Sequence, residues 1–415
     1  MHSVQEAEEI IFNLIEPFNH QTDTETVDLL NANGRILAAP IISQLDFPHW
    51  DNSAMDGFAL RYCDLSEYVE GKGIFLEIVE EIPAGYQPQS TIQSGQAARI
   101  FTGAVMPSGA DTVVMQENTR REGNRVFITA KPKPEEFVRK RASYYQAGEE
   151  LLSAGIILKP TEIAVLAAAQ CTQVEVFRRP RVAILSTGNE LITPEQILKP
   201  GQIVDSNQYA LSALIKEMGA EPLILGIIPD EATVLKKAIS HAIANADIVI
   251  SSGGVSVGEY DYVEKIIKSL GGKIHVSSIA VKPGKPLTVA KFSHFSNHIL
   301  NCMYFGLPGN PVSALVTFWR FVQPGIKKLS GIKDNWQPEF LQVITSQDLR
   351  SNGKRETYLW GELILKDEIY QFQLAGGSHS SGNLINITGI NALACLPVGK
   401  SLISAGEKVK VLQIS

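Results

Sequence analysis

The sequence predicts a multidomain α/β plus β protein, with a central doubly wound, mostly parallel sheet, an inserted mostly-β domain and a C-terminal β barrel. Three observations support this fold class. Between residues 179 and 331, short apolar runs alternate with segments of helical length, which is typical of a parallel sheet covered by helices. Short β-like segments with Gly/Pro turns fill residues 46–134 and return after residue 332, and they indicate two smaller β domains. The 415 residues are enough for about two to four domains.

The remaining segments complete the expected organisation. Residues 3–18 place apolar side chains at helical spacing, with acidic residues between them, and predict an opening amphipathic helix. Residues 161–170 predict a compact helix in a linking region. The expected domains are a linking domain of residues 1–45 and 135–178, the inserted β domain 46–134, the α/β domain 179–331 and the barrel 332–415.

Local patterns predict the individual elements. Apolar runs predict strands of the central sheet at 181–186, 222–227, 246–251, 274–280 and 303–306. The segments between and after them predict helices at 207–218, 231–244, 261–270 and 311–323. Further strands are expected at 73–82, 97–101, 111–117 and 125–130, and in the tail at 340–347, 357–365, 369–374, 392–398 and 408–415.

The composition excludes several classes of protein. A net charge of −7 gives no attraction to nucleic acid or to an anionic membrane. The N-terminus has an early acidic run instead of a basic signal region, and no apolar stretch approaches the ~20 residues that span a bilayer. The four cysteines form no CxxC pair and no zinc spacing. We therefore expect a soluble cytoplasmic protein without a nucleic-acid or membrane partner.

Polar residues gather where the expected strands end. The segment ISSGGVSVGEYD, residues 250–261, leaves a buried strand with three glycines and three serines. Such a loop turns backbone N–H groups towards an anion, although a flexible connector is the alternative explanation. Open parallel sheets bind ligands beyond the carboxyl ends of their strands. The other polar residues expected at that edge are Glu190, Asp230, Lys282, Lys285 and Asn310, with Asn310 as a helix N-cap before Pro311.

This edge predicts a site for a phosphate-bearing ligand and a metal ion. Backbone amides and lysines neutralise phosphate oxygens, and carboxylates beside them hold Mg²⁺. Each motif alone also has a structural explanation, as a helix cap or a surface charge. No Walker A motif, GxGxxG fingerprint, GxSxG elbow or HExxH helix is present, which disfavours common nucleotide-binding folds and standard hydrolases.

Seven stretches together resemble the molybdopterin molybdenumtransferase family, which includes bacterial MoeA and the E domain of gephyrin. They cover most of residues 40–330, and the tail matches more loosely through Arg355 and GGSHSSGNL (376–384). The stretches are SAMDGFAL (53–60), FTGAVMPSGADTVVMQE (101–117), RRPRVAILSTGNEL (178–191), PGQIVDSN (200–207), ISSGGVSVGEYDYV (250–263), VKPGKPL (281–287) and FGLPGNPVSALVTF (305–318).

The resemblance implies an elongated, four-domain homodimer with a molybdopterin-binding fold at its centre. Such an enzyme completes molybdenum cofactor synthesis by inserting molybdenum into molybdopterin. The resemblance implies adenylylated molybdopterin and molybdate as substrates, Mg²⁺ as cofactor and AMP as a product. Molybdopterin adenylyltransferase and molybdoenzyme chaperones are the further partners that it implies.

The resemblance also assigns catalytic roles by position. The metal ligands would be Glu190, Asp230 and Asp261, and the two lysines of VKPGKPL would hold anionic oxygen. Asp56 and Thr102 lie in the inserted domain and would reach the site of the partner subunit. The complete catalytic set is Asp56, Thr102, Glu190, Asp230, Asp261, Lys282 and Lys285.

A second set of residues would bind the substrates. The Ser/Gly loop would hold the phosphate groups of the pterin, and Ser313, Arg355 and Ser381 would lie near the molybdate site of related proteins. The complete substrate-binding set is Ser186, Thr187, Gly188, Ser252, Gly253, Gly254, Ser256, Gly258, Pro308, Gly309, Asn310, Ser313, Arg355 and Ser381.

The chain departs from the family's usual residues at three positions. Asn189 and Glu150 stand where aspartate is common, and Phe58 stands where tyrosine is usual. None of these changes removes the core set, so we expect an active enzyme. The alternatives are a molybdopterin adenylyltransferase, a non-catalytic scaffold that binds molybdopterin or molybdate, and a molybdate storage module. The additional domains argue against the first alternative, and the retained carboxylates and lysines argue against a purely structural role.

Overall fold

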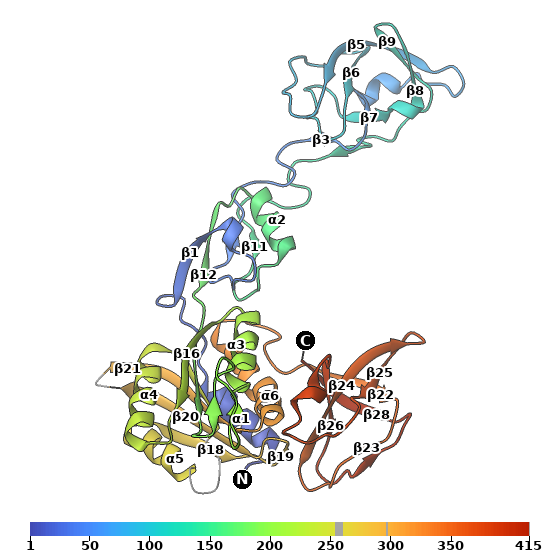
Figure 1. The fold of residues 1–415 in the computed structure, drawn as a ribbon. Helices are drawn as coiled ribbons and strands as arrows, with labels where there is room; N and C mark the ends of the chain where they lie inside the picture. The colour runs from blue at the N-terminus through green and yellow to red at the C-terminus, as the bar shows by residue number, and fades with distance from the viewer. Residues whose placement is uncertain (254–259, 296–297, 415) are drawn as a thin grey trace. The chain divides into compact units, whose positions relative to one another are not determined.

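The computed structural model describes residues 1–253, 260–295 and 298–414 (Figure 1). They form two compact units. Unit 1 contains Met1–Ala39, Ala154–Ala164 and Thr172–Ser415, and unit 2 contains Pro40–Ser153 and Val165–Cys171. No helix in the described part of the chain is long and apolar enough to cross a membrane.

The central sheet of unit 1 has six strands in the order β16-β13-β17-β21-β20-β18. The first four strands run parallel, β20 is antiparallel to β21, and β18 is antiparallel to β20. This arrangement confirms the mostly parallel sheet. The strands are β16 (Glu221–Ile228), β13 (Arg181–Thr187), β17 (Ile248–Gly253), β21 (His298–Leu307), β20 (Pro286–Phe295) and β18 (Lys273–Ser278).

One strand of this sheet was missing from the sequence prediction. β20 begins at Pro286, directly after the lysine loop, and forms a hairpin with β21. Proline is tolerated as the first residue of a strand, but it marks a turn when the sequence is considered alone. The expected strand at 303–306 is therefore only the second half of a longer strand.

Helices cover both faces of this sheet (Figure 1). Alternate residues of β13 show the two faces, because Val182 and Ile184 belong to one buried cluster and Ala183 and Leu185 to the other. The first face is covered by α1 (Val4–Leu14), α3 (Asn207–Glu217), α6 (Pro311–Thr317) and α7 (Gln323–Leu329), and the second by α4 (Ala232–Asn245) and α5 (Tyr260–Ser269).

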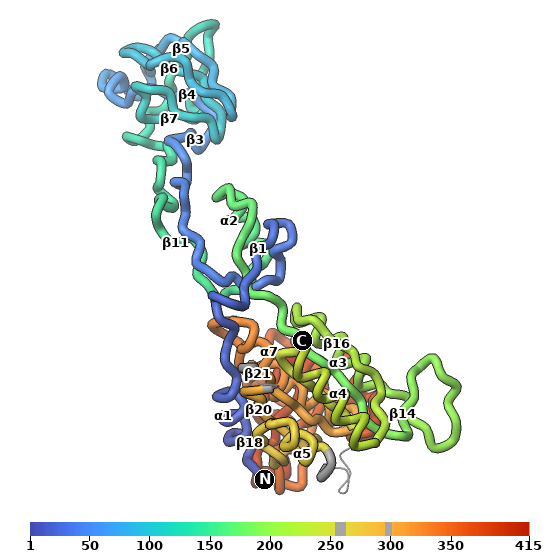
Figure 2. Tube along the Cα trace, turned by 90° about the vertical axis from the view of Figure 1, so that its left-hand side faces the viewer, coloured from blue at the N-terminus to red at the C-terminus, as the bar shows by residue number. Residues whose placement is uncertain are grey.

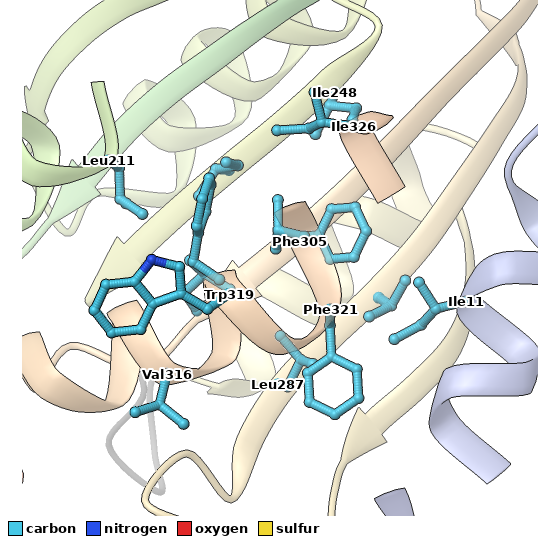
Figure 3. Packing of buried hydrophobic residues seen from close by; sticks show 14 of the residues in the cluster. Ile11, Leu211, Ile248, Leu287, Phe305, Val316, Trp319, Phe321 and Ile326 are labelled. Carbon is cyan, nitrogen blue, oxygen red and sulfur yellow. The ribbon is translucent and has the colours of Figure 1, made fainter. Parts of the chain in front are cut away.

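Figure 3 shows the packing on the first face, where Ile11 of α1, Leu211 of α3 and Phe305 of β21 contribute to one core. Each such buried side chain stabilises the fold by about 1.5–3 kcal/mol relative to exposure. The helix expected at 311–323 is longer than predicted, because a π-helix, Phe318–Val322, joins α6 to α7. This segment is buried throughout, so core packing continues the helix past Pro324 and Gly325, which would end it in isolation.

The C-terminal strands form a closed five-stranded barrel in the order β24-β25-β22-β28-β26, and β24 also pairs with β26. β19 (Val281–Lys282), from the lysine loop, pairs in parallel with β24. The barrel is thereby hydrogen-bonded to the α/β domain. The strands are β22 (Phe340–Thr345), β24 (Glu356–Lys366), β25 (Ile369–Leu374), β26 (Ala392–Leu396) and β28 (Lys408–Gln413).

Unit 2 contains a sheet of its own, in the order β7-β4-β6-β5-β9-β8. Its core contains Phe58, Leu76 and Val114. The mostly-β fold expected for the inserted domain is confirmed. Its strands are β4 (Gly57–Leu60), β5 (Ile74–Ile82), β6 (Gln96–Ile100), β7 (Thr112–Met115), β8 (Thr119–Glu122) and β9 (Arg125–Ile128).

Shorter elements occupy the connections. In unit 1, β1 (Thr24–Asp28) pairs with β12 (Gln173–Phe177). The helix expected at 161–170 is α2 (Pro160–Ala168). After β13, the short strands β14 (Leu191–Ile192) and β15 (Ile203–Val204) pair at the base of a loop that projects from the sheet (Figure 2).

Candidate functional site

Buried hydroxyl groups mark the carboxyl ends of β13 and β17. Ser186 and Ser252 are register partners, both are almost inaccessible to solvent, and their Oγ atoms lie 3.4 Å apart. Thr187, the next residue, is also buried and pairs with Gly253. Four of the predicted substrate-binding residues, Ser186, Thr187, Ser252 and Gly253, therefore lie together.

Asn207, the first residue of α3, connects this group to the end of β21. Its Nδ2 donates to the Gly309 carbonyl oxygen at 2.9 Å and lies 3.4 Å from Ser252 Oγ. Its side chain is nearly inaccessible, with 8% exposure. The sequence prediction gave Asn207 no role, although it ends the PGQIVDSN motif. We call Ser186, Ser252, Gly253, Asn207 and Gly309 the strand-end rim.

Two glycines of this rim allow backbones to approach closely. Gly253 has φ +90°, and a Cβ there would collide with the Thr187 carbonyl oxygen. A Cβ on Gly309 would lie 3.2 Å from Cα of Gly253. The last residue of β17 and the loop after β21 therefore touch through their backbones. Glycine loops of this kind present main-chain groups to a ligand.

The loop after β13 contains the predicted carboxylate Glu190 and forms hydrogen bonds to a second one, Asp230. The Asn189 N–H donates to Asp230 Oδ2, and the Asp230 N–H donates to Asn189 Oδ1, both at 3.2 Å. Glu190 is exposed, and its side chain folds back over Gly188. A Cβ added to Gly188 would lie 2.8 Å from both carboxylate oxygens of Glu190. The neutral Asn189 thus fixes the position of Asp230 without adding a third negative charge.

The third predicted metal ligand is Asp261, the second residue of α5. Its side chain, together with Gly254, Ser256 and Gly258, lies outside the described residues. Across the described ranges, no three His, Cys, Asp or Glu side chains form a group that would hold a metal ion. Mg²⁺ often takes only one or two protein carboxylates and completes its shell with phosphates and water. Glu190 and Asp230 are the two predicted metal ligands whose side chains the structure describes, and both come from loops at the carboxyl ends of neighbouring strands.

Strand pairing and one glycine place the two predicted lysines. Lys282 lies in β19 in register with Thr357 of β24. Gly284 has φ +110° and packs on α6, where a Cβ would lie 2.5 Å from Thr317 Cγ2. The absence of a side chain at Gly284 lets the loop lie against the helix. Lys282 and Lys285 consequently line the same cavity.

This cavity has a volume of about 510 Å³ and lies between the lysine loop, the first turn of α6 and the barrel. We call it the basic cavity. Ser313 of α6 is buried in its wall, and the Arg355 guanidinium donates to the Val281 carbonyl oxygen at 3.1 Å. Among the described residues, no Asp or Glu lines it. The charged residues that line it are Lys282, Lys285, Arg350 and Arg355.

Hydrogen bonds across the cavity tie the barrel to α6. Asn310 occupies the N-cap position, as predicted, but its side chain does not cap the helix. Its Nδ2 instead donates to Ser381 Oγ at 3.2 Å, and the Val312 N–H donates to the Ser381 carbonyl oxygen at 3.1 Å. The structure thus brings Ser313, Arg355 and Ser381 together with both predicted lysines.

Among the cavity residues that the sequence prediction did not include are one arginine and one histidine. Arg350 comes from the start of the barrel, and His379 lies within the GGSHSSGNL motif. The His379 ring stacks on Trp360 at a centroid distance of 4.5 Å, and its Nε2 lies 2.9 Å from the Ala375 carbonyl oxygen. The motif contained the signal for His379, whereas nothing near Arg350 in the sequence distinguished it from a surface arginine.

In unit 2, the predicted residues Asp56 and Thr102 form a bonded pair. Asp56 Oδ1 accepts hydrogen bonds from the Thr102 backbone N–H at 2.8 Å and from its hydroxyl at 2.7 Å. These bonds, helped by the charge of Arg99, hold the pKa of the Asp56 carboxyl below its ordinary value. Asp56 is therefore a fixed, ionised carboxylate at neutral pH.

A larger cavity, of about 730 Å³, lies between α1, α7 and the barrel. It contains none of the predicted site residues, and its lining mixes acids with bases, including a hydrogen-bonded pair of Glu8 and Arg320. Its charges are therefore largely compensated. The one-sided charge of the basic cavity makes the smaller space the better candidate for an anionic substrate.

Comparisons with known proteins identify the family. The chain matches models of the MoeA N-terminal region (domain I and II) over residues 2–169, of a probable molybdopterin binding domain over 183–328, and of the MoeA C-terminal region (domain IV) over 342–414. The molybdopterin molybdenumtransferase of Nostoc sp. is 62% identical over 414 residues, covering 100% of this chain and 94% of that protein. The corresponding protein of Haemophilus influenzae is 35% identical and covers 96% of each chain.

A solved structure of the molybdopterin biosynthesis MoeA protein from Pyrococcus horikoshii superposes with a TM-score of 0.84. The match covers 100% of both chains at 27% identity. The high identity to the curated relatives over the whole length is decisive. The chain belongs to the molybdopterin molybdenumtransferase family, and it is an enzyme of molybdenum cofactor biosynthesis.

Proposed function

We propose that the enzyme inserts molybdenum from molybdate into adenylylated molybdopterin, in a Mg²⁺-dependent reaction that releases AMP. The observation that carries the proposal is the basic cavity, which gathers Lys282, Lys285, Ser313, Arg355 and Ser381 beside α6. A tetrahedral dianion is the substrate that such a lining suits. The same helix begins at Pro311, and only the N-cap residue Asn310 separates it from Gly309 of the strand-end rim.

The strand-end rim would hold the phosphate groups of adenylylated molybdopterin. Its buried hydroxyls and touching glycine backbones support this role, because a Gly/Ser loop binds phosphate through main-chain N–H groups. Glu190 and Asp230 would hold Mg²⁺ against those phosphates. Mg²⁺ would supply positive charge where the P–O–P bond to AMP breaks.

The basic cavity would hold molybdate until the dithiolene sulfurs replace oxygens on molybdenum. Lys282, Lys285 and Arg355 offset the dianionic charge, and Ser313 and Ser381 orient it by hydrogen bonds. Arg355 is oriented by its bond to the Val281 carbonyl oxygen. The remaining guanidinium donors of Arg355 would then meet molybdate oxygens in a defined direction.

We further propose that the enzyme is a homodimer with sites shared between subunits, in which Asp56 and Thr102 of one chain serve the partner's site. The hydrogen-bonded, ionised state of Asp56 supports a role in substrate chemistry. In this proposal each chain has four domains, with the boundaries expected from the sequence. Two-fold symmetry would give two equivalent composite sites.

AMP release tests the reaction. Purified enzyme is incubated with adenylylated molybdopterin and Mg²⁺, with and without molybdate, and AMP is measured by chromatography. We expect AMP release that depends on both molybdate and Mg²⁺, and a large loss in Lys285→Ala. Binding of both substrates without AMP release would contradict the proposal and favour the scaffold alternative.

Mixing of subunits tests the shared site. Inactive Asp56→Asn subunits are combined with inactive Lys285→Ala subunits under conditions that allow exchange, which is verified by mass. A shared site leaves one intact site in each mixed dimer, so activity should return to about half per heterodimer by symmetry. If mixing restores nothing after verified exchange, the two residues act within one chain.

A further inference from the structure

We propose that the basic cavity selects tetrahedral dianions that carry no proton, so that it binds molybdate and sulfate but discriminates against hydrogen phosphate. This inference rests on the proposed function, because it takes the basic cavity as the molybdate site. It adds the chemical rule by which the enzyme would separate its substrate from a far more common oxyanion.

The rule follows first from the charged groups in the lining. All of them are basic, and no carboxylate of the described residues lines the cavity. Near pH 8, hydrogen phosphate and sulfate are tetrahedral dianions of similar size, and they differ by one O–H group. That O–H requires an acceptor, and a buried donor left without one costs about 1–3 kcal/mol. A carboxylate would be the strongest acceptor, and the described lining supplies none.

The hydrogen bonds of the uncharged groups support the same rule. Ser381 Oγ already accepts from Asn310, so its own hydrogen remains for donation to the anion. Trp360 lines the cavity with only 1% exposure, and within the described ranges its indole Nε1 has no hydrogen-bond partner. An indole nitrogen is a donor and never an acceptor. The hydroxyl of Tyr358 is occupied, because it accepts from Arg320 and donates to Glu356.

His379 is the ring in the lining that offers an acceptor. Its Nε2 bonds the Ala375 carbonyl oxygen, and a carbonyl only accepts, so Nε2 carries the proton. Nδ1 of the neutral ring is then unprotonated, and it has no partner among the described residues. His379→Phe removes this acceptor and keeps an aromatic ring against Trp360. We expect this change to widen the preference for sulfate over phosphate, or to leave it unchanged.

Calorimetry with the full-length enzyme tests the proposal. Sodium molybdate, sulfate and phosphate are titrated separately at pH 8 and at constant ionic strength, and Arg355→Ala identifies the binding that belongs to the basic cavity. We expect molybdate and sulfate to bind, and phosphate to bind at least about fivefold more weakly than sulfate, which corresponds to 1 kcal/mol.

Two results would overturn different parts of the scheme. If phosphate binds within twofold of sulfate in the Arg355-dependent signal, selection by protonation is wrong and the molybdate site stands. If molybdate itself shows no Arg355-dependent binding, the cavity is not the oxyanion site and the proposed function loses its main support.

A pair of tryptophan variants tests the donor lining directly. Trp360→Phe keeps the ring but removes the N–H, and it should lower sulfate and molybdate affinity by about 2–13-fold, the range expected for one hydrogen bond. Trp319→Phe is the matched control, because Trp319 is also buried with an unpartnered Nε1 among the described residues but lines a different cavity. Equal effects of the two changes would remove Trp360 from the donor set.

Discussion

The strand-end rim and the basic cavity belong to the same unit, yet they are built in different ways. The rim consists of backbone and small buried polar groups at the ends of β13, β17 and β21, and its glycines allow main chains to touch. The basic cavity consists of long cationic side chains from the α/β domain and from the barrel. The difference matches the two ligands that we propose, because fixed main-chain geometry would suit phosphates and concentrated positive charge would suit an oxyanion.

Gly253→Ala should have the largest effect, because it damages the backbone of the rim. The new Cβ collides with the Thr187 carbonyl oxygen in a backbone with φ +90°. Left-handed strain costs about 1–2 kcal/mol and overpacking about 1–3 kcal/mol more. Gly226→Ala is the control, since its φ is +82° but its Cβ would have open space. Urea denaturation and AMP release measure both. Equal loss of stability would show that the contact with Thr187 is not tight.

Arg355→Ala should damage the basic cavity and spare the rim. Loss of a hydrogen bond to a charged group costs about 1.5–3 kcal/mol, so molybdate affinity should fall by about 10–150-fold. Affinity for adenylylated molybdopterin should change little. Arg350→Ala should have a smaller effect, because that side chain is 73% exposed and paired with Asp348. Equal losses of both ligands would mean that the two regions form one site.

Asn207→Ala should damage the rim and spare the basic cavity, which is the reverse of the effect expected for Arg355→Ala. The change leaves the Gly309 carbonyl oxygen without its side-chain donor, and loss of such a buried bond costs about 1–3 kcal/mol. Affinity for adenylylated molybdopterin should fall, while molybdate binding to the cavity persists. Asn245→Ala is the control, because Asn245 donates to the His241 carbonyl oxygen within α4. Calorimetry measures the affinity of the Asn207→Ala variant for each ligand. Loss of molybdate binding, with adenylylated molybdopterin still bound, would refute the assignment of separate ligands to the rim and the cavity.

Thr102→Val should have the smallest effect, limited to the ionisation of Asp56. The hydroxyl bond disappears while the backbone N–H remains, so the pKa of Asp56 should rise part of the way towards its ordinary value. A lowered carboxyl pKa stabilises the native state above the ordinary carboxyl range, and that stabilisation is lost as the pH falls through the native pKa. NMR titration of the carboxyl carbon measures the shift, and an unchanged pKa would assign it to the backbone bond and Arg99.

The sequence predicted the rim better than it predicted the cavity. Ser186, Ser252 and Gly253 lie at the ends of apolar, buried strands, so the local sequence pattern was enough to find them. Asn207 was missed because its contact with Gly309 spans 102 residues. Arg350 was missed because a surface arginine and a cavity arginine look the same in sequence.

The same distinction holds for the fold. Apolar periodicity predicted the strands of the central sheet and the tail, because side-chain burial repeats along each element. β19 and β20 were not predicted, because each depends on pairing with a partner strand, β24 or β21. The added length of the helix after Pro311 likewise depends on burial by surrounding elements.

The sequence by itself determined where the chain carries glycines, serines, carboxylates and lysines after buried strands, since these choices are local. Only the tertiary structure decided that Ser381 bonds Asn310, that Lys282 lies opposite Thr357, and that Lys282, Lys285, Arg350 and Arg355 share one cavity. The physical reason is that charge acts through space. Residues distant in the chain determine the character of a site only after strand pairing and core packing have brought them together.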